Sequence, residues 1–100
     1  MKKIILLCNQ GMSTSALVAK MNTAAESMGL ECSIAAYAVD TAKTNAADAD
    51  VIFLGPQVRY KLSFVKEIFP DKPVEVIDMA AYGMMDGAAV VKRAQKLMEG

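Results

Sequence analysis

Four short apolar runs alternate along the chain with stretches in which apolar residues recur every three or four positions. The runs cover residues 4–8, 33–39, 50–54 and 74–77. Their length and their small or β-branched residues are typical of buried strands. The stretches that follow predict helices. Their apolar positions are Leu17, Met21, Ala24 and Met28, then Val58, Leu62, Val65 and Phe69, and finally Val90, Ala94 and Leu97.

Turn and cap residues set the expected ends of these elements. Ser13, Thr14 or Ser15 can cap the first helix, and Gly29 can end it in a left-handed conformation. Asp40 opens a short second helix that runs to about residue 47. Two loops are expected, one around residues 70–73, which prolines bracket, and one over residues 79–86.

The resulting order, in which each strand is followed by a helix, favours one α/β domain over residues 1–100. Such alternation predicts a parallel sheet with helices on both faces. We expect the flavodoxin-like strand order 2-1-3-4. Functional crevices in such sheets lie beyond the carboxyl ends of the strands, at the switch point between the first and third. The segments 8–15 and 55–57 should therefore be neighbours.

Composition excludes several classes of protein. The 11 basic and 11 acidic residues balance, which gives no electrostatic footprint for nucleic acid. The longest apolar run, residues 4–8, is far shorter than a membrane span. We therefore expect a cytoplasmic protein without membrane insertion, and we expect its two cysteines to be reduced. The chain has no histidine, so catalytic dyads and triads with histidine are impossible, and no metal or cofactor is expected.

The end of the first strand carries the candidate chemistry. Cys8 ends a buried strand and is followed by Asn9, Gln10, Gly11 and Met12, and then by Ser13, Thr14 and Ser15 at the start of a helix. Free amide groups at a helix start and a glycine loop bind anions. Positive potential there favours the thiolate form of Cys8, and the same donors can hold a phosphoryl group on its sulfur.

Other interpretations of Cys8 stay open at this point. A cysteine at a strand end is often only a small buried hydrophobe, which is how we interpret Cys32. A cysteine phosphatase would follow the pattern C-x-x-x-x-x-R, but Thr14 occupies the arginine position. A redox module would pair Cys8 with Cys32. The missing arginine favours a site that accepts and passes on phosphate over one that hydrolyses it.

The whole chain resembles the lactose, cellobiose and diacetylchitobiose family of IIB components of the sugar phosphotransferase system. The resemblance rests on Cys8 with residues 11–15, on the segment 54–57, on residues 72–78, and on Tyr82-Gly83 with Asp86-Gly87. It implies the α/β fold that low-molecular-weight phosphatases share. It also implies that Cys8 takes a phosphoryl group from a phosphohistidine on a IIA partner and passes it to a sugar in the membrane IIC component. The sugar would be a β-linked disaccharide such as cellobiose, chitobiose or lactose.

The resemblance assigns roles to further residues. Residues 9–15 match the family's phosphate-binding loop. A docking surface should surround Cys8, and its candidates are Met12, Pro56, Gln57, Val58 and Tyr82. Val58 equally fits the core, as the first residue of its helical stripe.

Overall fold

The four predicted strands form one parallel sheet in the computed structural model, which describes residues 1–9 and 12–99. The strands are β1 (Lys2–Cys8), β2 (Cys32–Ala38), β3 (Val51–Leu54) and β4 (Val74–Val76). Their order is β2-β1-β3-β4, and every neighbouring pair is parallel. The predicted fold class and strand order are therefore confirmed.

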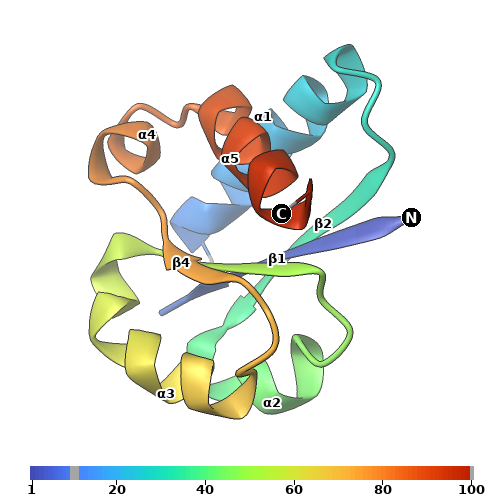
Figure 1. Cartoon of the computed structure of the whole chain (residues 1–100). Helices are drawn as coiled ribbons and strands as arrows, with labels where there is room; N and C mark the ends of the chain where they lie inside the picture. Colours follow the sequence, from blue (N-terminus) through green and yellow to red (C-terminus); the bar gives the residue numbers. More distant parts are fainter. Residues whose placement is uncertain (10–11, 100) are drawn as a thin grey trace.

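Helices cover both faces of the sheet, as Figure 1 shows. On one face lie α1 (Met12–Ser27), α4 (Met79–Gly83) and α5 (Gly87–Glu99). The other face carries η1 (Val39–Thr41), α2 (Ala42–Asn45), η2 (Pro56–Lys61) and α3 (Leu62–Ile68), where η marks a 3-10 helix. No helix in the described ranges is long and apolar enough to cross a membrane.

The continuous apolar run of β1 follows from this double cover. Ile4 and Leu6 belong to the core beneath α1 and α5, whereas Ile5 and Leu7 belong to the core on the opposite face. All four are buried. A strand with one exposed face would instead alternate apolar with polar residues. The sheet thus separates two cores, and β1 contributes to both.

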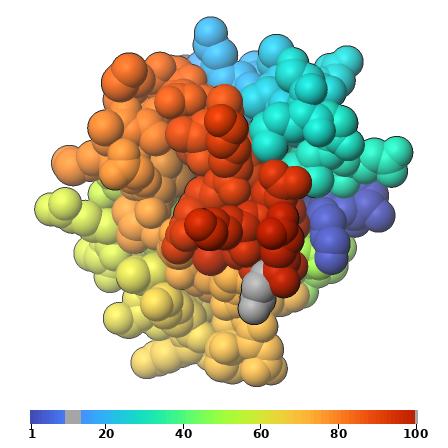
Figure 2. All heavy atoms as spheres, turned by 45° about the horizontal axis from the view of Figure 1, so that its top comes forward, coloured from blue at the N-terminus to red at the C-terminus, as the bar shows by residue number. Residues whose placement is uncertain are grey.

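The helix pair α1 and α5 packs unusually closely at Gly87. A Cβ atom on Gly87 would lie 2.5 Å from backbone atoms of both Lys20 and Met21. Figure 2 shows α5, in red, filling the middle of this face between the α4 segment in orange and the cyan residues at the end of α1. Glycine is therefore required where these two helices meet.

Two predicted boundaries differ from the structure. Helix α1 begins at Met12, so Ser13, Thr14 and Ser15 lie within its first turn and not before it. The expected loop over residues 79–86 contains the short helix α4, because Asp78 accepts a hydrogen bond from the amide of Ala81 and caps its first turn. The predicted end of α1 is confirmed, since Gly29 has a φ of 69°.

Candidate functional site

Cys8 lies at the carboxyl end of β1, one of the two central strands. Its side chain is only 2% exposed. The sulfur lies 3.9 Å from the carbonyl oxygen of Tyr37 on β2, at a distance where the thiol donates a weak hydrogen bond.

The segment that follows β3 lies directly beside Cys8. The Gly55 amide donates to the Leu7 carbonyl oxygen at 2.9 Å, which extends the pairing of β1 with β3 beyond the strand end. A Cβ atom on Gly55 would lie 3.8 Å from the Cβ atom of Cys8. The structure therefore confirms that the ends of the first and third strands are neighbours.

Gln57 connects this point to the segment that follows β4. Its amide nitrogen Nε2 donates to the Tyr82 hydroxyl at 2.8 Å, which joins η2 to α4. Its oxygen Oε1 would lie 2.7 Å from a Cβ atom on Gly55, so a side chain at Gly55 would displace it. Gln57 thus joins the segment that follows β3 to the segment that follows β4, at the carboxyl edge of the sheet where Cys8 lies.

The predicted phosphate-binding loop is described in part. Asn9 is exposed directly after Cys8, whereas Gln10 and Gly11 lie outside the described residues. The side chains of Met12 and Ser13 are likewise not described, although their backbone belongs to α1.

The two remaining residues of that loop, Thr14 and Ser15, differ in burial. Ser15 is exposed. Thr14 is 1% exposed, and its hydroxyl oxygen Oγ1 has no hydrogen-bond partner. A buried hydroxyl without a partner is costly in a folded protein and often marks a ligand site or another functional role. The Thr14 hydroxyl therefore has an unused hydrogen-bond donor inside the fold.

The docking candidates differ in how far they are exposed to solvent. Gln57 is exposed, and Pro56 is half-buried beside it. Tyr82 packs its ring against the core beneath α1 and α5 while its hydroxyl group reaches Gln57. Val58 is 1% exposed and belongs to the core on the opposite face, which agrees with its place in the helical stripe.

Three side chains beside these candidates had not been selected from the sequence. Arg59, Tyr60 and Met79 join Pro56 and Gln57 around an open hollow of about 560 Å³ between η2 and α4. A usable signal was present, because all five belong to the segments that follow β3 and β4: four lie in η2 and Met79 begins α4. Loop segments at the carboxyl edge of a parallel sheet gather in this way.

Arg93, Asp78 and Asp86, three of the groups that could serve a phosphatase, are engaged elsewhere. Arg93 forms an ion pair with Glu75, which links α5 to β4. The carboxylates of Asp78 and Asp86 accept amide hydrogen bonds from Ala81 and Ala89 at helix starts. Among residues 1–9 and 12–99, histidine, cysteine and acidic side chains form no group of three that could hold a metal ion.

Cys32 lies at the opposite end of the sheet from Cys8. In the register of β1 with β2, Cys8 pairs with Ala38 and Cys32 pairs with Lys2. Six residues along a strand span about 20 Å, whereas a disulfide needs Cα atoms within ~7 Å. Both thiols are free, and partial burial raises the pKa of Cys32. A redox pair of the two cysteines is therefore excluded in this fold.

Comparison of the sequence with known proteins matches this chain to one family. The model of the family "PTS system, Lactose/Cellobiose specific IIB subunit" matches residues 3–93. The oligo-β-mannoside-specific EIIB component of Bacillus subtilis is 47% identical, over 98% of this chain and 97% of its own. The cellobiose-specific EIIB component of Lactococcus lactis subsp. lactis is 41% identical, over 97% of this chain and 96% of its own.

Solved structures agree with this assignment. The cellobiose-specific IIB component of Borrelia burgdorferi superposes with a TM-score of 0.81 at 33% identity, over 98% of this chain and 92% of the other. The lactose-specific IIB domain of Streptococcus pneumoniae shares the fold at a TM-score of 0.84 and 16% identity, with 96% of each chain covered. The chain therefore belongs to the family of lactose/cellobiose-specific IIB subunits of the sugar phosphotransferase system.

Proposed function

We propose that this protein is a phosphoryl carrier that holds the phosphoryl group on the sulfur of Cys8. The observation that carries the proposal is the position of Cys8. It ends a central strand at the carboxyl edge of the sheet, immediately before the start of α1 and beside the segment that follows β3. Parallel α/β sheets bind their ligands at this place.

The reaction would consist of two displacements at phosphorus. The Cys8 thiolate attacks the phosphorus of a phosphohistidine on the IIA partner, so that a P–S bond forms while the P–N bond breaks and the imidazole leaves. A sugar hydroxyl in the IIC component then attacks the same phosphorus, and the P–S bond breaks to regenerate the thiolate. The chain has no histidine, which fits a donor that supplies its own.

The residues near Cys8 would hold the phosphoryl group between these steps. We assign residues 9–15 to this role, with the unpartnered Thr14 hydroxyl as one donor and the amides at the start of α1 as others. Electrostatic stabilisation of this kind is usually the largest catalytic contribution in phosphoryl transfer. Because Cys8 is buried, its neighbours must shift when the donor docks.

Membership of the family supports a proposal for the partners and the sugar. We propose a phosphorylated IIA component as donor, a membrane IIC component as site of transfer, and the cytoplasm as compartment, with one IIB domain over residues 1–100. The relatives are named for oligo-β-mannosides, galactose and cellobiose. A β-linked disaccharide is therefore our proposed substrate class for the transporter that this chain serves.

Replacement of Cys8 by serine tests the proposal. The chain is incubated with labelled phosphoenolpyruvate, the two general phosphotransferase proteins and purified IIA components of the three relatives' systems. We expect one phosphate per chain, stable in alkali but labile to iodine as a thiophosphate ester is, and no label in Cys8→Ser.

Cys32→Ser is the matched control, since the second thiol lies at the far end of the sheet, and it should be labelled like the native chain. Label that persists in Cys8→Ser would contradict the proposal. So would the absence of label with all three IIA components. Steady release of phosphate from an aryl phosphate, lost in Cys8→Ser, would instead indicate a phosphatase.

A further inference from the structure

The side-chain amide of Gln57 presents its oxygen, and not its nitrogen, on the side of Cys8. Its nitrogen Nε2 donates to the Tyr82 hydroxyl at 2.8 Å. Its oxygen Oε1 lies 2.7 Å from the position that a Cβ atom on Gly55 would take, and the Cβ atom of Cys8 lies 3.8 Å from the same position. Figures 1 and 2 show the yellow-green η2 segment and the orange α4 segment next to each other on one side of the molecule. One end of the amide thus contacts α4, and the other covers the residue beside Cys8.

This orientation suits a chain without phosphate on Cys8 better than a chain that carries it. An amide oxygen only accepts hydrogen bonds, whereas the amide nitrogen of glutamine is a donor. The oxygens of a phosphoryl group on Cys8 are negatively charged acceptors. An amide oxygen beside them would repel them, whereas an amide nitrogen in the same place would bind them.

Tyr82 can hold either orientation of the amide. Its hydroxyl group accepts the hydrogen bond from Nε2 in this structure, and a phenol hydroxyl can equally donate one. Gln57 is exposed, so its amide has room to turn. Rotation by half a turn would place Oε1 at the Tyr82 hydroxyl and Nε2 beside Gly55. The hydrogen bond between the two residues is then retained, with Tyr82 as the donor.

We propose that Gln57 is a further ligand of the phosphoryl group, and that its amide turns when Cys8 is phosphorylated so that Nε2 donates to a phosphoryl oxygen. The group lengthens the Cys8 side chain by one P–S and one P–O bond, toward the amide that covers Gly55. Hydrogen bonds to charged groups are stronger than neutral ones, which favours the turned state. Tyr82 is the positioning residue, because it holds Oε1 in that state.

The inference rests on the proposed function and adds a ligand from the segment that follows β3 to those assigned to residues 9–15. The side-chain amide signals of the ¹⁵N-labelled chain test the rotation. Gln57→Met identifies the signals of Gln57 by their loss. We expect them to shift when Cys8 is phosphorylated, and the exchange of their protons with water to slow, because Nε2 then donates to a charged acceptor. The signals of Gln95, on α5, should stay in place.

The equilibrium of phosphoryl transfer separates a ligand of the phosphoryl group from a docking residue. Docking affinity changes how fast the equilibrium between phosphorylated IIA and Cys8 is reached, but not where it lies. Labelled phosphate is partitioned between the chain and a IIA component of the relatives' systems, at concentrations too low for their complex to accumulate. Gln57→Met should lower the equilibrium constant about tenfold, because it removes the donor without adding charge. Gln95→Met is the matched control and should leave it unchanged.

The role of Tyr82 is tested in the same equilibrium. Tyr82→Phe should lower the constant about threefold in the native chain and not at all in Gln57→Met, because Tyr82 acts on the phosphoryl group only through Gln57. Urea unfolding verifies that the variants are folded. An equal effect of Tyr82→Phe in both backgrounds would overturn its positioning role.

Two further results would overturn the inference as a whole. One is a Gln57→Met chain in which the rate of transfer falls but the equilibrium constant does not, which would make Gln57 a docking residue. The other is a Gln57 amide whose exchange with water does not slow on phosphorylation. Either result in a native chain that carries phosphate on Cys8 leaves the proposed function standing. A native chain that takes no phosphate on Cys8 contradicts the proposed function and, with it, this inference.

Discussion

At the scale of single residues, the hydroxyl group of Thr14 is the observation that best supports our proposal of a phosphoryl site at this edge of the sheet. It is buried in the first turn of α1 without a hydrogen-bond partner. An unsatisfied buried hydroxyl costs about 1–3 kcal/mol. A bound phosphoryl group would supply the acceptor that the free protein lacks.

Thr14→Val should therefore raise the stability of the protein but lower its phosphorylation at Cys8. We expect the free energy of unfolding to rise by about 1 kcal/mol, because the unpaired hydroxyl is replaced by a methyl group of similar shape. The fraction of chain phosphorylated at Cys8 should fall several-fold under the same conditions. Urea unfolding and label incorporation measure the two effects.

Thr23→Val serves as the control for this change. Thr23 is exposed on the same helix, and its hydroxyl donates to the Ala19 carbonyl oxygen at 3.1 Å. Neither stability nor labelling should change much. A strong loss of stability in Thr14→Val would mean that its hydroxyl has a partner in the native protein.

At the scale of elements, the close approach of α1 and α5 depends on Gly87. We expect Gly87→Ala to destabilise the protein by about 1–3 kcal/mol, because the added methyl group would collide with the backbone at Lys20 and Met21. Gly83→Ala is the matched substitution. Nothing lies within 4 Å of a Cβ atom there, and alanine at the end of α4 should be neutral or stabilise by up to about 1 kcal/mol. Equal thermal unfolding of the two variants would contradict this packing.

The ion pair between Lys3 and Asp48 joins the beginning of β1 to the loop before β3, with 2.7 Å between Nζ and Oδ2. The hydrogen bond and charge of Lys3 hold the pKa of Asp48 below its usual 3.8. The contribution of Asp48 to stability is thus present above that value and is lost as the pH falls through the lower, folded-state pKa.

We expect Asp48→Asn to be slightly less stable than the native chain above about pH 5 and to match it near about pH 2. The difference should also shrink in salt, because both side chains are largely exposed. Unfolding temperatures across this pH range measure it. Asp71→Asn, at an exposed aspartate that forms no ion pair with a described residue, should show no such convergence. A difference that persists at low pH would contradict the assignment.

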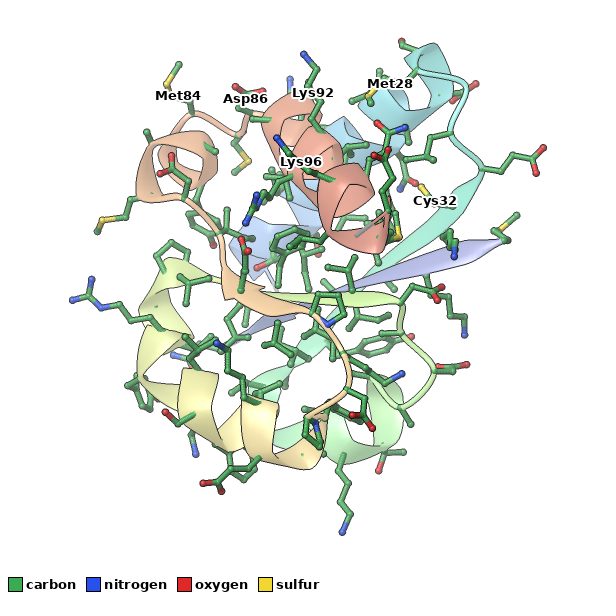
Figure 3. The ribbon with its side chains drawn as sticks, in the orientation of Figure 1. Met28, Cys32, Met84, Asp86, Lys92 and Lys96 are labelled. Carbon is green, nitrogen blue, oxygen red and sulfur yellow. The ribbon has the colours of Figure 1, made fainter. Side chains whose placement is uncertain are left out.

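At the scale of the whole molecule, the parallel sheet keeps its two thiols apart. Figure 3 shows Cys32 near the beginning of β2, close to the N-terminal end of β1 and remote from the edge where Cys8 lies. We expect an air-oxidised sample, unfolded under non-reducing conditions, to react with two equivalents of a thiol reagent per chain, and Cys32→Ser to react with one. An intramolecular disulfide found by mass spectrometry would be incompatible with this register.

Much of this architecture could be predicted from local patterns. The apolar run 4–8 identifies a strand buried on both faces, and the alternation of strands with helices leaves few topologies. Helix α4 was missed because its five residues carry no helical stripe and their capping depends on Asp78. The position of Cys8 beside Gly55 followed from the topology alone.

The finer features of the site depend on contacts between distant segments. The hydrogen bond from Gln57 to Tyr82 joins residues 25 positions apart, and nothing in the sequence indicates that these two side chains meet. The burial of Thr14 depends on how α1 packs against the sheet. The hollow requires Tyr60 and Met79 to leave different strands toward the same space. Such relations arise from tertiary packing, which periodicity along the chain does not encode.

The burial of Cys8 also determines how the protein ages. Oxidation of a cysteine to sulfenic acid, and from there to irreversible forms, requires that a peroxide reach the sulfur as thiolate. With 2% of the residue exposed and its sulfur near the Tyr37 carbonyl oxygen, Cys8 is shielded from small oxidants in this conformation. If Cys8 carries the phosphoryl group as we propose, its sulfur is open to oxidation only while it is uncovered for transfer, and the number of transfer cycles then sets how fast the protein is inactivated.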